Sequence, residues 1–141
     1  MNPLHLSNQL CFPFYAISKE ISKRYRTILA PFNLTYPQYL VMLVLWEQDR
    51  IPLKAIGRRL QLDSGTLTPL LNKLIQSGYI EKARNELDER ELVIKLTDAG
   101  HSLREQAASI PLQIQRVLGL TDDEYKRYKG MLDELSQKLN M

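Results

Sequence analysis

Apolar side chains recur every three or four residues between positions 9 and 29, which is the period of an amphipathic α-helix. The stripe consists of Leu10, Phe14, Ile17, Ile21, Tyr25 and Ile28. Pro13 fits this helix only in its first turn, where a missing backbone N–H costs nothing. Pro31 and Asn33 then interrupt the pattern, so the sequence predicts a first helix over 9–29.

A second helix is indicated by the residues at its start. Thr35-Tyr-Pro-Gln38 places a hydroxyl at the cap, a glutamine three residues later and a proline in the first turn, which is typical of a capping box. The residues from Tyr39 to Trp46 are apolar on every side of this helix. A helix of that kind is normally buried, so we expect it in the middle of the domain.

Two further helices are predicted from their caps. Pro52 begins a short one that reaches about Leu60. Asp63-Ser64-Gly65 supplies caps for the next, which ends at Gly78 because glycine adopts the left-handed conformation that terminates helices. The face expected to point inward on this helix consists of Leu67, Leu70, Leu71 and Leu74.

The hydrophobic period then changes to two, as in a β-strand, over residues 79–84 and again over 91–96. Polar residues 85–90 separate these segments, so together they predict a β-hairpin. Helix, helix, tight turn, helix and hairpin is the element order of a winged helix-turn-helix. The sequence therefore predicts a mainly α fold with a small β-hairpin wing, in a single domain over residues 1–141.

Two more helices follow the hairpin. Thr97 and Asp98 cap one that reaches about Leu118, and a capping box at 121–124 begins the last. The outer helices carry apolar side chains that one small domain can scarcely cover, namely Leu6, Leu10, Phe14, Leu118, Leu132, Leu135 and Leu139. We therefore expect residues 8–30 and 97–141 to pair with a second copy, around a winged lobe over residues 35–96.

Composition excludes several classes of protein. With 44% apolar and 25% charged residues among 141, the chain is typical of one globular domain rather than a disordered tail. Its longest apolar stretch has eight residues, whereas a transmembrane helix needs roughly twenty. The single cysteine, Cys11, allows neither an intrachain disulfide nor a cysteine-rich metal site. We therefore expect a reducing, cytoplasmic setting and no cofactor.

The distribution of charge favours a nucleic-acid partner. Nineteen basic and 16 acidic residues give a net charge of +3, and the whole excess lies between Arg50 and Leu96. Small and hydroxyl-bearing residues at the start of the fourth helix permit close approach to base edges and phosphates. The residues expected to contact DNA are Ser64, Gly65, Thr66, Thr68, Pro69 and Lys73, with Arg84 and Arg90 from the hairpin. An ordinary capped amphipathic helix is the alternative interpretation.

Four short segments resemble one family of regulators. They are Asn-Gln-Leu-Cys-Phe at 8–12, Leu-Thr-Tyr-Pro-Gln-Tyr-Leu at 34–40, Leu-Asp-Ser-Gly-Thr-Leu-Thr-Pro-Leu-Leu at 62–71 and Asp-Glu-Arg at 88–90. On these segments the chain resembles a MarR-type transcriptional regulator over its whole length. Within that family it is most similar to the one-cysteine organic-hydroperoxide sensors of the OhrR type. The resemblance implies an obligate homodimer, helical apart from its wing, that represses by occupying a palindromic operator in double-stranded DNA.

The resemblance also implies roles for residues at matched positions. Cys11 matches the peroxide-reactive cysteine near the start of the first helix. Tyr25 and Tyr36 match the two tyrosines whose hydroxyls hydrogen-bond that thiol from the other subunit. Arg90 matches the wing arginine that enters the minor groove, and Asp88 matches the residue that steadies it.

Spacing along the first helix is compatible with a site between two subunits. Fourteen positions separate Cys11 from Tyr25, so at about 100° and 1.5 Å per residue they share a face but lie roughly 21 Å apart. They can meet only across a two-fold axis, if the first helices of two copies run antiparallel. Tyr15 shares the face of Cys11 and is expected to line the same pocket. Pro13 departs from the family's motif at a position that bears on the reactivity of the thiol.

These observations lead to one hypothesis and several alternatives. We expect a redox-sensing repressor, not an enzyme, that releases its operator when organic peroxides oxidise Cys11. A sulfenic acid on the single cysteine cannot be resolved within the chain, so a small thiol is one candidate mixed-disulfide partner. Because a cysteine on an apolar face is more often inert, a MarR-type regulator that binds a phenolic ligand remains an alternative. A thiol-dependent peroxidase would need a resolving thiol, and a pure interaction module would not explain the hairpin arginines.

Overall fold

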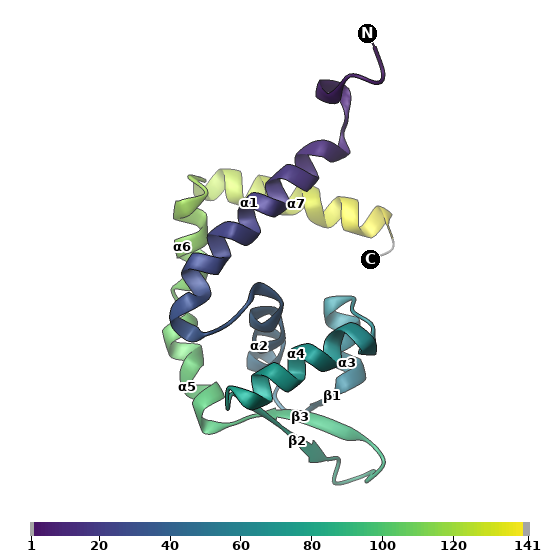
Figure 1. The fold of residues 1–141 in the computed structure, drawn as a ribbon, viewed down its shortest axis with the longest axis vertical. Helices are drawn as coiled ribbons and strands as arrows, with labels where there is room; N and C mark the ends of the chain where they lie inside the picture. Colours follow the sequence, from purple (N-terminus) through teal and green to yellow (C-terminus); the bar gives the residue numbers. More distant parts are fainter. Residues whose placement is uncertain (1, 140–141) are drawn as a thin grey trace.

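The computed structural model describes residues 2–139, which are mainly helical and have a small sheet at one end (Figure 1). The α-helices are α1 (Cys11–Leu29), α2 (Tyr36–Glu47), α3 (Leu53–Leu60), α4 (Ser64–Gln76), α5 (Asp98–Ala107), α6 (Ile110–Val117) and α7 (Asp122–Lys138). The strands are β1 (Ile51–Pro52), β2 (Ile80–Arg84) and β3 (Leu92–Leu96), and 3-10 turns η1 (Leu6–Asn8) and η2 (Ala30–Phe32) flank α1. The predicted winged helix-turn-helix with long outer helices is confirmed.

Several helices begin at the caps that the sequence predicts. The Thr35 hydroxyl accepts a hydrogen bond from the backbone N–H of Gln38 at 3.4 Å, and the Gln38 side chain accepts from the N–H of Thr35 at 3.0 Å. Thr121 and Glu124 form the same reciprocal pair before α7. Each capping box satisfies two backbone N–H groups that would otherwise lack partners, which fixes where the helix begins.

Two helix boundaries differ from the prediction. The single helix expected over 97–118 is two helices, α5 and α6, which are separated at residues 108–109. Pro111 stands in the first turn of α6, and a proline there cannot continue the hydrogen-bond ladder of α5 because it has no N–H. At the other end, α1 begins at Cys11 rather than at residue 9, and Pro13 lies in its first turn as expected.

The predicted hairpin is part of a three-stranded antiparallel sheet. β2 and β3 pair with Ile80 opposite Leu96, and β1 pairs along the other edge of β3 with Ile51 opposite Ile94. The strand order is therefore β1-β3-β2. At two residues, one of them a proline, β1 is too short to show a period in the sequence, but it joins the start of α3 to the wing.

Most of the core lies within residues 35–96, which we term the lobe, and the core continues into the end of α1, Leu34, α5 and α6. As its all-apolar pattern predicts, α2 is the central helix, and its buried apolar residues are Tyr39, Val41, Met42, Val44 and Leu45. The buried residues of α4 are Leu67, Leu71 and Leu74. Trp46, near the end of α2, donates from its indole Nε1 to the carbonyl of Gly100 at 3.0 Å, which joins the lobe to α5.

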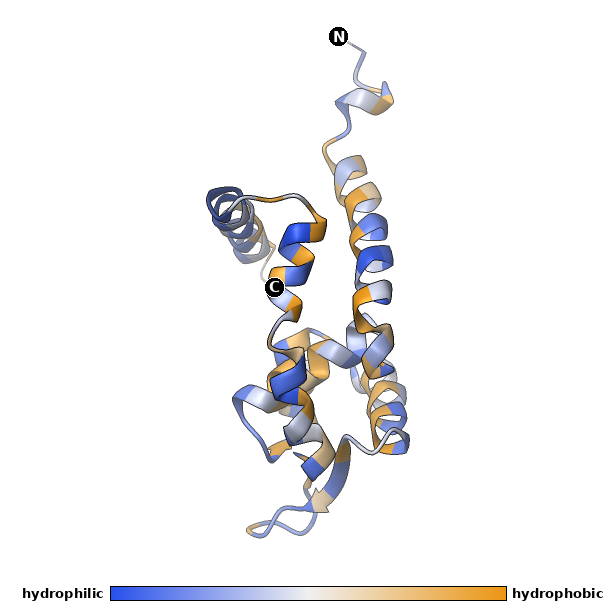
Figure 2. Cartoon of the chain, turned by 90° about the vertical axis from the view of Figure 1, so that its left-hand side faces the viewer, coloured by the Kyte–Doolittle hydropathy of each residue, from blue (hydrophilic) through white to orange (hydrophobic). Residues whose placement is uncertain are grey.

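The terminal helices α1 and α7 extend beyond the lobe, and Figure 2 shows apolar residues along α1 on the part that projects from it. Only Ile28 and Leu29 are buried in α1, and α7 has no buried residue. The exposed large apolar side chains near the two ends of the chain include Leu6, Leu10, Phe12, Phe14, Tyr15, Ile17, Tyr125, Tyr128, Met131, Leu132 and Leu139. A single chain therefore leaves most of the predicted apolar faces uncovered.

No single helix within residues 2–139 is long and apolar enough to cross a bilayer. The segments Cys11–Phe32 and Tyr36–Glu47 meet the requirements of length and composition only when taken together, across a bend of 65°. The second of these segments is the core helix α2.

Candidate nucleic-acid interface and cysteine region

Helix α4 presents its polar side away from the core. Its N-cap, Asp63, accepts a hydrogen bond from the backbone N–H of Thr66 at 2.8 Å. This backbone bond, followed by the Thr66 side chain, holds the pKa of the Asp63 carboxyl below its ordinary value, so the cap is ionised at neutral pH. The residues predicted to contact DNA are exposed or half-buried on this helix, and they are Ser64, Gly65, Thr66, Thr68, Pro69 and Lys73.

The turn of the wing is held by hydrogen bonds to its own backbone. Arg84 ends β2 and donates from Nη1 to the carbonyl of Glu89 at 3.0 Å. Asp88 accepts through Oδ1 from the backbone N–H of Arg90 at 3.0 Å. Asp88 thus orients the backbone of Arg90, whose side chain is exposed. The structure brings these three predicted residues together at the outer end of the wing.

Several acidic side chains lie at the same turn, and of these only Asp88 belongs to the predicted interface. Four carboxylates occupy positions 86, 88, 89 and 91, and Leu87 at the tip is 97% exposed. These carboxylates repel the phosphates that a DNA-bound wing must approach, whereas Arg84 and Arg90 attract them. The net charge of residues 50–96 conceals this local excess of negative charge.

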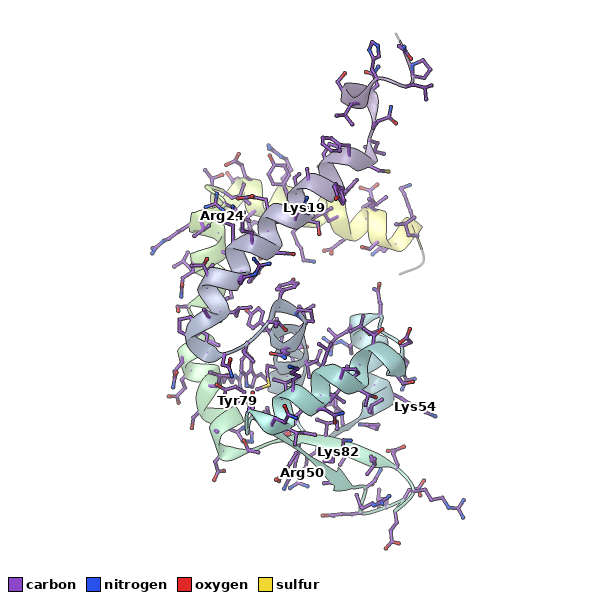
Figure 3. All side chains as sticks on the ribbon, viewed as in Figure 1. Lys19, Arg24, Arg50, Lys54, Tyr79 and Lys82 are labelled. Carbon is purple, nitrogen blue, oxygen red and sulfur yellow. The ribbon has the colours of Figure 1, made fainter. Side chains whose placement is uncertain are left out.

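Further cations lie on other elements of the lobe. Figure 3 labels Arg50, Lys54 and Lys82, which come from the residue before β1, from α3 and from β2. Lys54 and Arg58 border a depression of about 580 Å³ between α3 and the start of α4. The positive charge predicted from the sequence is therefore spread over α3, β2 and the residue before β1, in addition to α4, the expected recognition helix.

Cys11 is the first residue of α1 and is exposed. Tyr15 lies one turn further along and is 62% exposed, with the Lys19 ammonium 5.2 Å from the centre of its ring (Lys19 is labelled in Figure 3). Because α1 is continuous to Leu29, Cys11 and Tyr25 are separated by roughly 21 Å and cannot meet within one chain.

The tyrosines at the other end of α1 form a cluster. The ring centroids of Tyr25 and Tyr36 lie 4.4 Å apart, and that of Tyr39 lies 6.0 Å from Tyr25 and 6.5 Å from Trp46. Burial, followed by the neighbouring Tyr36, raises the pKa of Tyr25, so its hydroxyl stays protonated and able to donate. The structure therefore brings together the two tyrosines predicted for the sensing site. It adds Tyr39 and Trp46, which the sequence reasoning placed only in the core.

The histidines do not gather into a metal centre. His101 Nε2 lies 3.2 Å from Asp49 Oδ2, whereas His5 precedes the turn η1 near the N-terminus. Within residues 2–139, no three His, Cys, Asp or Glu side chains are grouped so that they could hold a metal ion.

The fold and its charged face define a class of protein. A helical lobe with a hairpin wing and an exposed, hydroxyl-rich start to its recognition helix is a winged helix-turn-helix of the DNA-binding type. Residues 23–106 match the family described as "Transcriptional regulator SarA/Rot". The chain belongs to this SarA/MarR family of winged-helix transcriptional regulators. It is accordingly a DNA-binding regulator and not an enzyme.

Individual relatives extend the similarity to nearly the whole chain. The organic hydroperoxide resistance transcriptional regulator of Bacillus subtilis is 43% identical over 137 residues, which cover 97% of this chain and 93% of that protein. The regulator TtmR of Methylorubrum extorquens is 46% identical, over 96% of this chain and 68% of that protein. The predicted resemblance to regulators of organic hydroperoxide resistance is thereby confirmed.

Solved structures of AbfR, from Staphylococcus epidermidis, share the fold. Reduced AbfR bound to DNA gives a TM-score of 0.81 at 41% identity, covering 96% of this chain and 92% of that one. Overoxidized AbfR bound to DNA gives 0.73 at 40% identity, covering 95% and 94%. Disulfide-formed AbfR gives 0.67 at 41% identity, covering 96% and 90%. The present structure is thus more similar to the reduced, DNA-bound form than to the disulfide form.

Proposed function

We propose that this protein is a homodimeric repressor that releases a pseudo-palindromic operator when an organic hydroperoxide oxidises Cys11. One observation carries the proposal. Cys11 lies exposed at the outer end of α1 among uncovered apolar side chains, while Tyr25 and Tyr36 lie together at the inner end. Two antiparallel copies of α1 would therefore place each cysteine beside the tyrosines of the other copy. The Bacillus relative, named for organic hydroperoxide resistance, supports the choice of oxidant.

The terminal helices supply the dimer surface in this proposal. Their exposed side chains include Leu10, Phe14, Met131 and Leu132, whose burial against a second copy would remove them from water. A two-fold dimer of this kind presents two α4 helices about one turn of DNA apart, roughly 34 Å. Sedimentation should give a dimer at micromolar concentration, and a stable monomer would contradict the proposal.

DNA contacts are divided between α4 and the wing. The first turns of α4 enter the major groove, where Ser64, Thr66 and Thr68 reach base edges and Lys73 reaches a phosphate. Gly65 and Pro69 leave room for close approach. Arg84 and Arg90 follow the minor groove, and Asp88 holds the backbone that carries Arg90.

The chemistry at Cys11 proceeds in two balanced steps. The thiolate attacks one peroxide oxygen of ROOH, so a sulfur–oxygen bond forms, the oxygen–oxygen bond breaks, and the alkoxide leaves and takes a proton to become the alcohol. Sulfur is oxidised by two electrons and the peroxide is reduced by two. A small thiol then attacks the sulfenic acid, which forms a sulfur–sulfur bond and releases water. Neither product fits between the tyrosine hydroxyls as the thiolate does, so α1 must shift.

The test has to distinguish two oxidised forms of Cys11, the mixed disulfide with a small thiol and the overoxidised cysteine. AbfR has been solved bound to DNA in its overoxidized form. The test titrates an operator-bound sample with an organic hydroperoxide, with and without a small thiol, for the wild type and Cys11→Ser. We expect release of the wild type, more complete when the thiol is present, and no release of Cys11→Ser. If Cys11→Ser dissociates at the same peroxide concentration, the redox mechanism is wrong, and a regulator that binds a phenolic ligand takes its place.

The tyrosines have a separate test. Tyr25→Phe and Tyr36→Phe keep the aromatic rings but remove the hydroxyls that would donate to the Cys11 thiolate. Both variants should bind the operator when reduced and should respond to peroxide more slowly or incompletely. Wild-type release rates for both variants would remove the tyrosines from the mechanism without affecting the role of Cys11.

A further inference from the structure

The residue that follows the recognition helix is hydrogen-bonded to the end of the cysteine-bearing helix. The hydroxyl of Tyr79 donates to the carbonyl of Phe32 at 2.9 Å across 47 positions of the sequence. Phe32 closes the turn η2 that follows α1, and Tyr79 lies between α4 and β2. Figure 3 labels Tyr79 on the side of the lobe near α5. One side chain thus connects α1 to both elements that are proposed to contact DNA.

The backbone of Tyr79 is fixed on the side of the lobe. Its N–H donates to the carbonyl of Leu74 at 3.1 Å, next to Gly78 at a φ of +82°, which is how a glycine-terminated helix closes its last turn. Its carbonyl accepts from the N–H of Thr97 at 3.1 Å and lies so close to Gly100 that a Cβ added there would be 2.1 Å away. Tyr79 therefore cannot shift without moving the end of α4 or the start of β2.

Phe32 is fixed to α1 in a similar way. The N–H of Ala30 donates to the carbonyl of Arg26, and that of Leu34 donates to the carbonyl of Leu29 at 3.4 Å, so η2 follows α1 without a flexible link. From Cys11 to the end of α1 the helix is about 27 Å long, at 1.5 Å per residue. A continuous helix of this length moves as one body, so a displacement that begins at Cys11 reaches Phe32.

Because α1 is connected to Tyr79 by a hydrogen bond, the connection depends on how α1 is oriented relative to the lobe. The apolar contacts of Ile28 and Leu29 with the core tolerate small rotations, because hydrophobic contact has no preferred angle. The bond from Tyr79 weakens steeply with distance and misalignment. A contact can couple two sites only if its free energy differs between the two states, and this bond meets that requirement if α1 shifts.

We propose that Tyr79 is a positioning residue that couples the redox state of Cys11 to the orientation of the recognition helix and the wing. This inference rests on the proposed function. With Cys11 reduced, the bond to Phe32 is made and holds α4 and β2 in the orientation that binds the operator. With Cys11 oxidised, α1 carries the Phe32 carbonyl away from the hydroxyl, and both DNA-contacting elements lose this restraint together.

The test compares operator affinity in two redox states for three full-length dimers. The proteins are the wild type, Tyr79→Phe and, as a control that removes a hydroxyl from the exposed side of α5, Ser102→Ala. The dissociation constant is measured by anisotropy on a duplex that the wild type selects from a random pool. Each protein is measured reduced and after treatment with cumene hydroperoxide and a small thiol. Circular dichroism and thermal unfolding check that each variant is folded.

We expect Tyr79→Phe to weaken binding in the reduced state by about 2- to 12-fold, the range that one net hydrogen bond supports. Binding in the oxidised state should be unchanged, so the ratio of the two dissociation constants falls by the same factor. Ser102→Ala should keep the wild-type ratio.

Two results would overturn the inference while leaving the proposed function intact. An equal loss of affinity in both states would show that Tyr79 only supports the lobe. Wild-type dissociation constants of Tyr79→Phe in both states would show that the bond carries no coupling. If the wild type itself binds equally well in both states, the proposed redox function fails and the inference fails with it.

Discussion

The lobe and the terminal helices differ in how many of their apolar side chains a single chain can bury. In the lobe, every large apolar side chain of α2 and α4 except Leu43 is buried or half-buried, and the N-terminus of each helix is capped. In α7 the start is capped just as well, yet no residue of the helix is buried. Local signals therefore define both regions equally, whereas only the lobe contains its own core. The apolar residues of the terminal helices have a physical function only if a second copy covers them.

The largest expected effect comes from removing one core leucine. Leu71 is fully buried in α4, so Leu71→Ala should lower the free energy of unfolding by about 2–5 kcal/mol at any protein concentration. Leu132→Ala on α7, where the side chain is 48% exposed, should instead lower a melting temperature that rises with protein concentration. Denaturant unfolding for Leu71→Ala and thermal unfolding for Leu132→Ala, each at two protein concentrations, check both. A concentration-independent loss in Leu132→Ala would show that α7 is stabilised within its own chain.

The next effect separates DNA binding from stability. Arg90→Ala on the wing should weaken operator binding by about 1–3 kcal/mol, as for loss of one groove contact, without changing the unfolding transition. Lys126→Ala removes an exposed cation from α7 and should leave affinity almost unchanged. Anisotropy titrations of both variants make the comparison. Equal losses would indicate general electrostatic attraction rather than a specific wing contact.

A smaller effect of opposite sign is expected at the wing tip. Glu86→Gln and Glu89→Gln remove carboxylates that repel DNA phosphates, so each should tighten binding. Each should also steepen the dependence of log affinity on log salt by up to about 0.9. Glu134→Gln on α7 is the matched control and should change neither. Binding measured between low and physiological salt tests this, and weaker binding by the wing variants would contradict the repulsion.

The smallest effect compares two caps and disappears at low pH. Hydrogen bonds from Thr66 lower the pKa of Asp63, and those from Thr121 lower that of Glu124. Because both folded pKa values lie below the unfolded ones, each cap stabilises fully above its ordinary pKa, and this contribution is lost as pH falls through the folded pKa. Asp63→Asn and Glu124→Gln should therefore approach wild-type stability in acid. A constant difference in unfolding free energy from pH 7 to pH 2 would exclude this linkage.

Sequence reasoning succeeded where the signal was local. The capping box at Thr35, the glycine stop at Gly78 and the change of period at the hairpin each depend on a few neighbouring residues. The break between α5 and α6 was missed because the apolar stripe continues across it, from Ala107 to Ile110 and Ile114 with helical spacing. The pattern records which side chains face the core and is insensitive to a short interruption of the backbone.

Contacts between distant residues account for most of what the sequence could not predict. The strand β1 exists because Ile51 meets Ile94, and the bond from Tyr79 to Phe32 joins residues 47 positions apart. No local pattern indicates which two residues meet in such a pair. The predicted DNA-contacting residues lie on the expected helix and wing, and their roles stay predictions, as do those of Cys11 and the tyrosines.

Trp46 is the single tryptophan of the chain, and its indole N–H is bonded to the carbonyl of Gly100, where the lobe meets α5. All tryptophan fluorescence of the protein therefore comes from this one position. Tyr39, with its ring centroid 6.5 Å away, is close enough to transfer excitation energy to it. The intrinsic fluorescence of the unlabelled protein can therefore be used to follow the rate of a rearrangement at this junction. A stopped-flow trace recorded after mixing with peroxide would time that rearrangement with no DNA present.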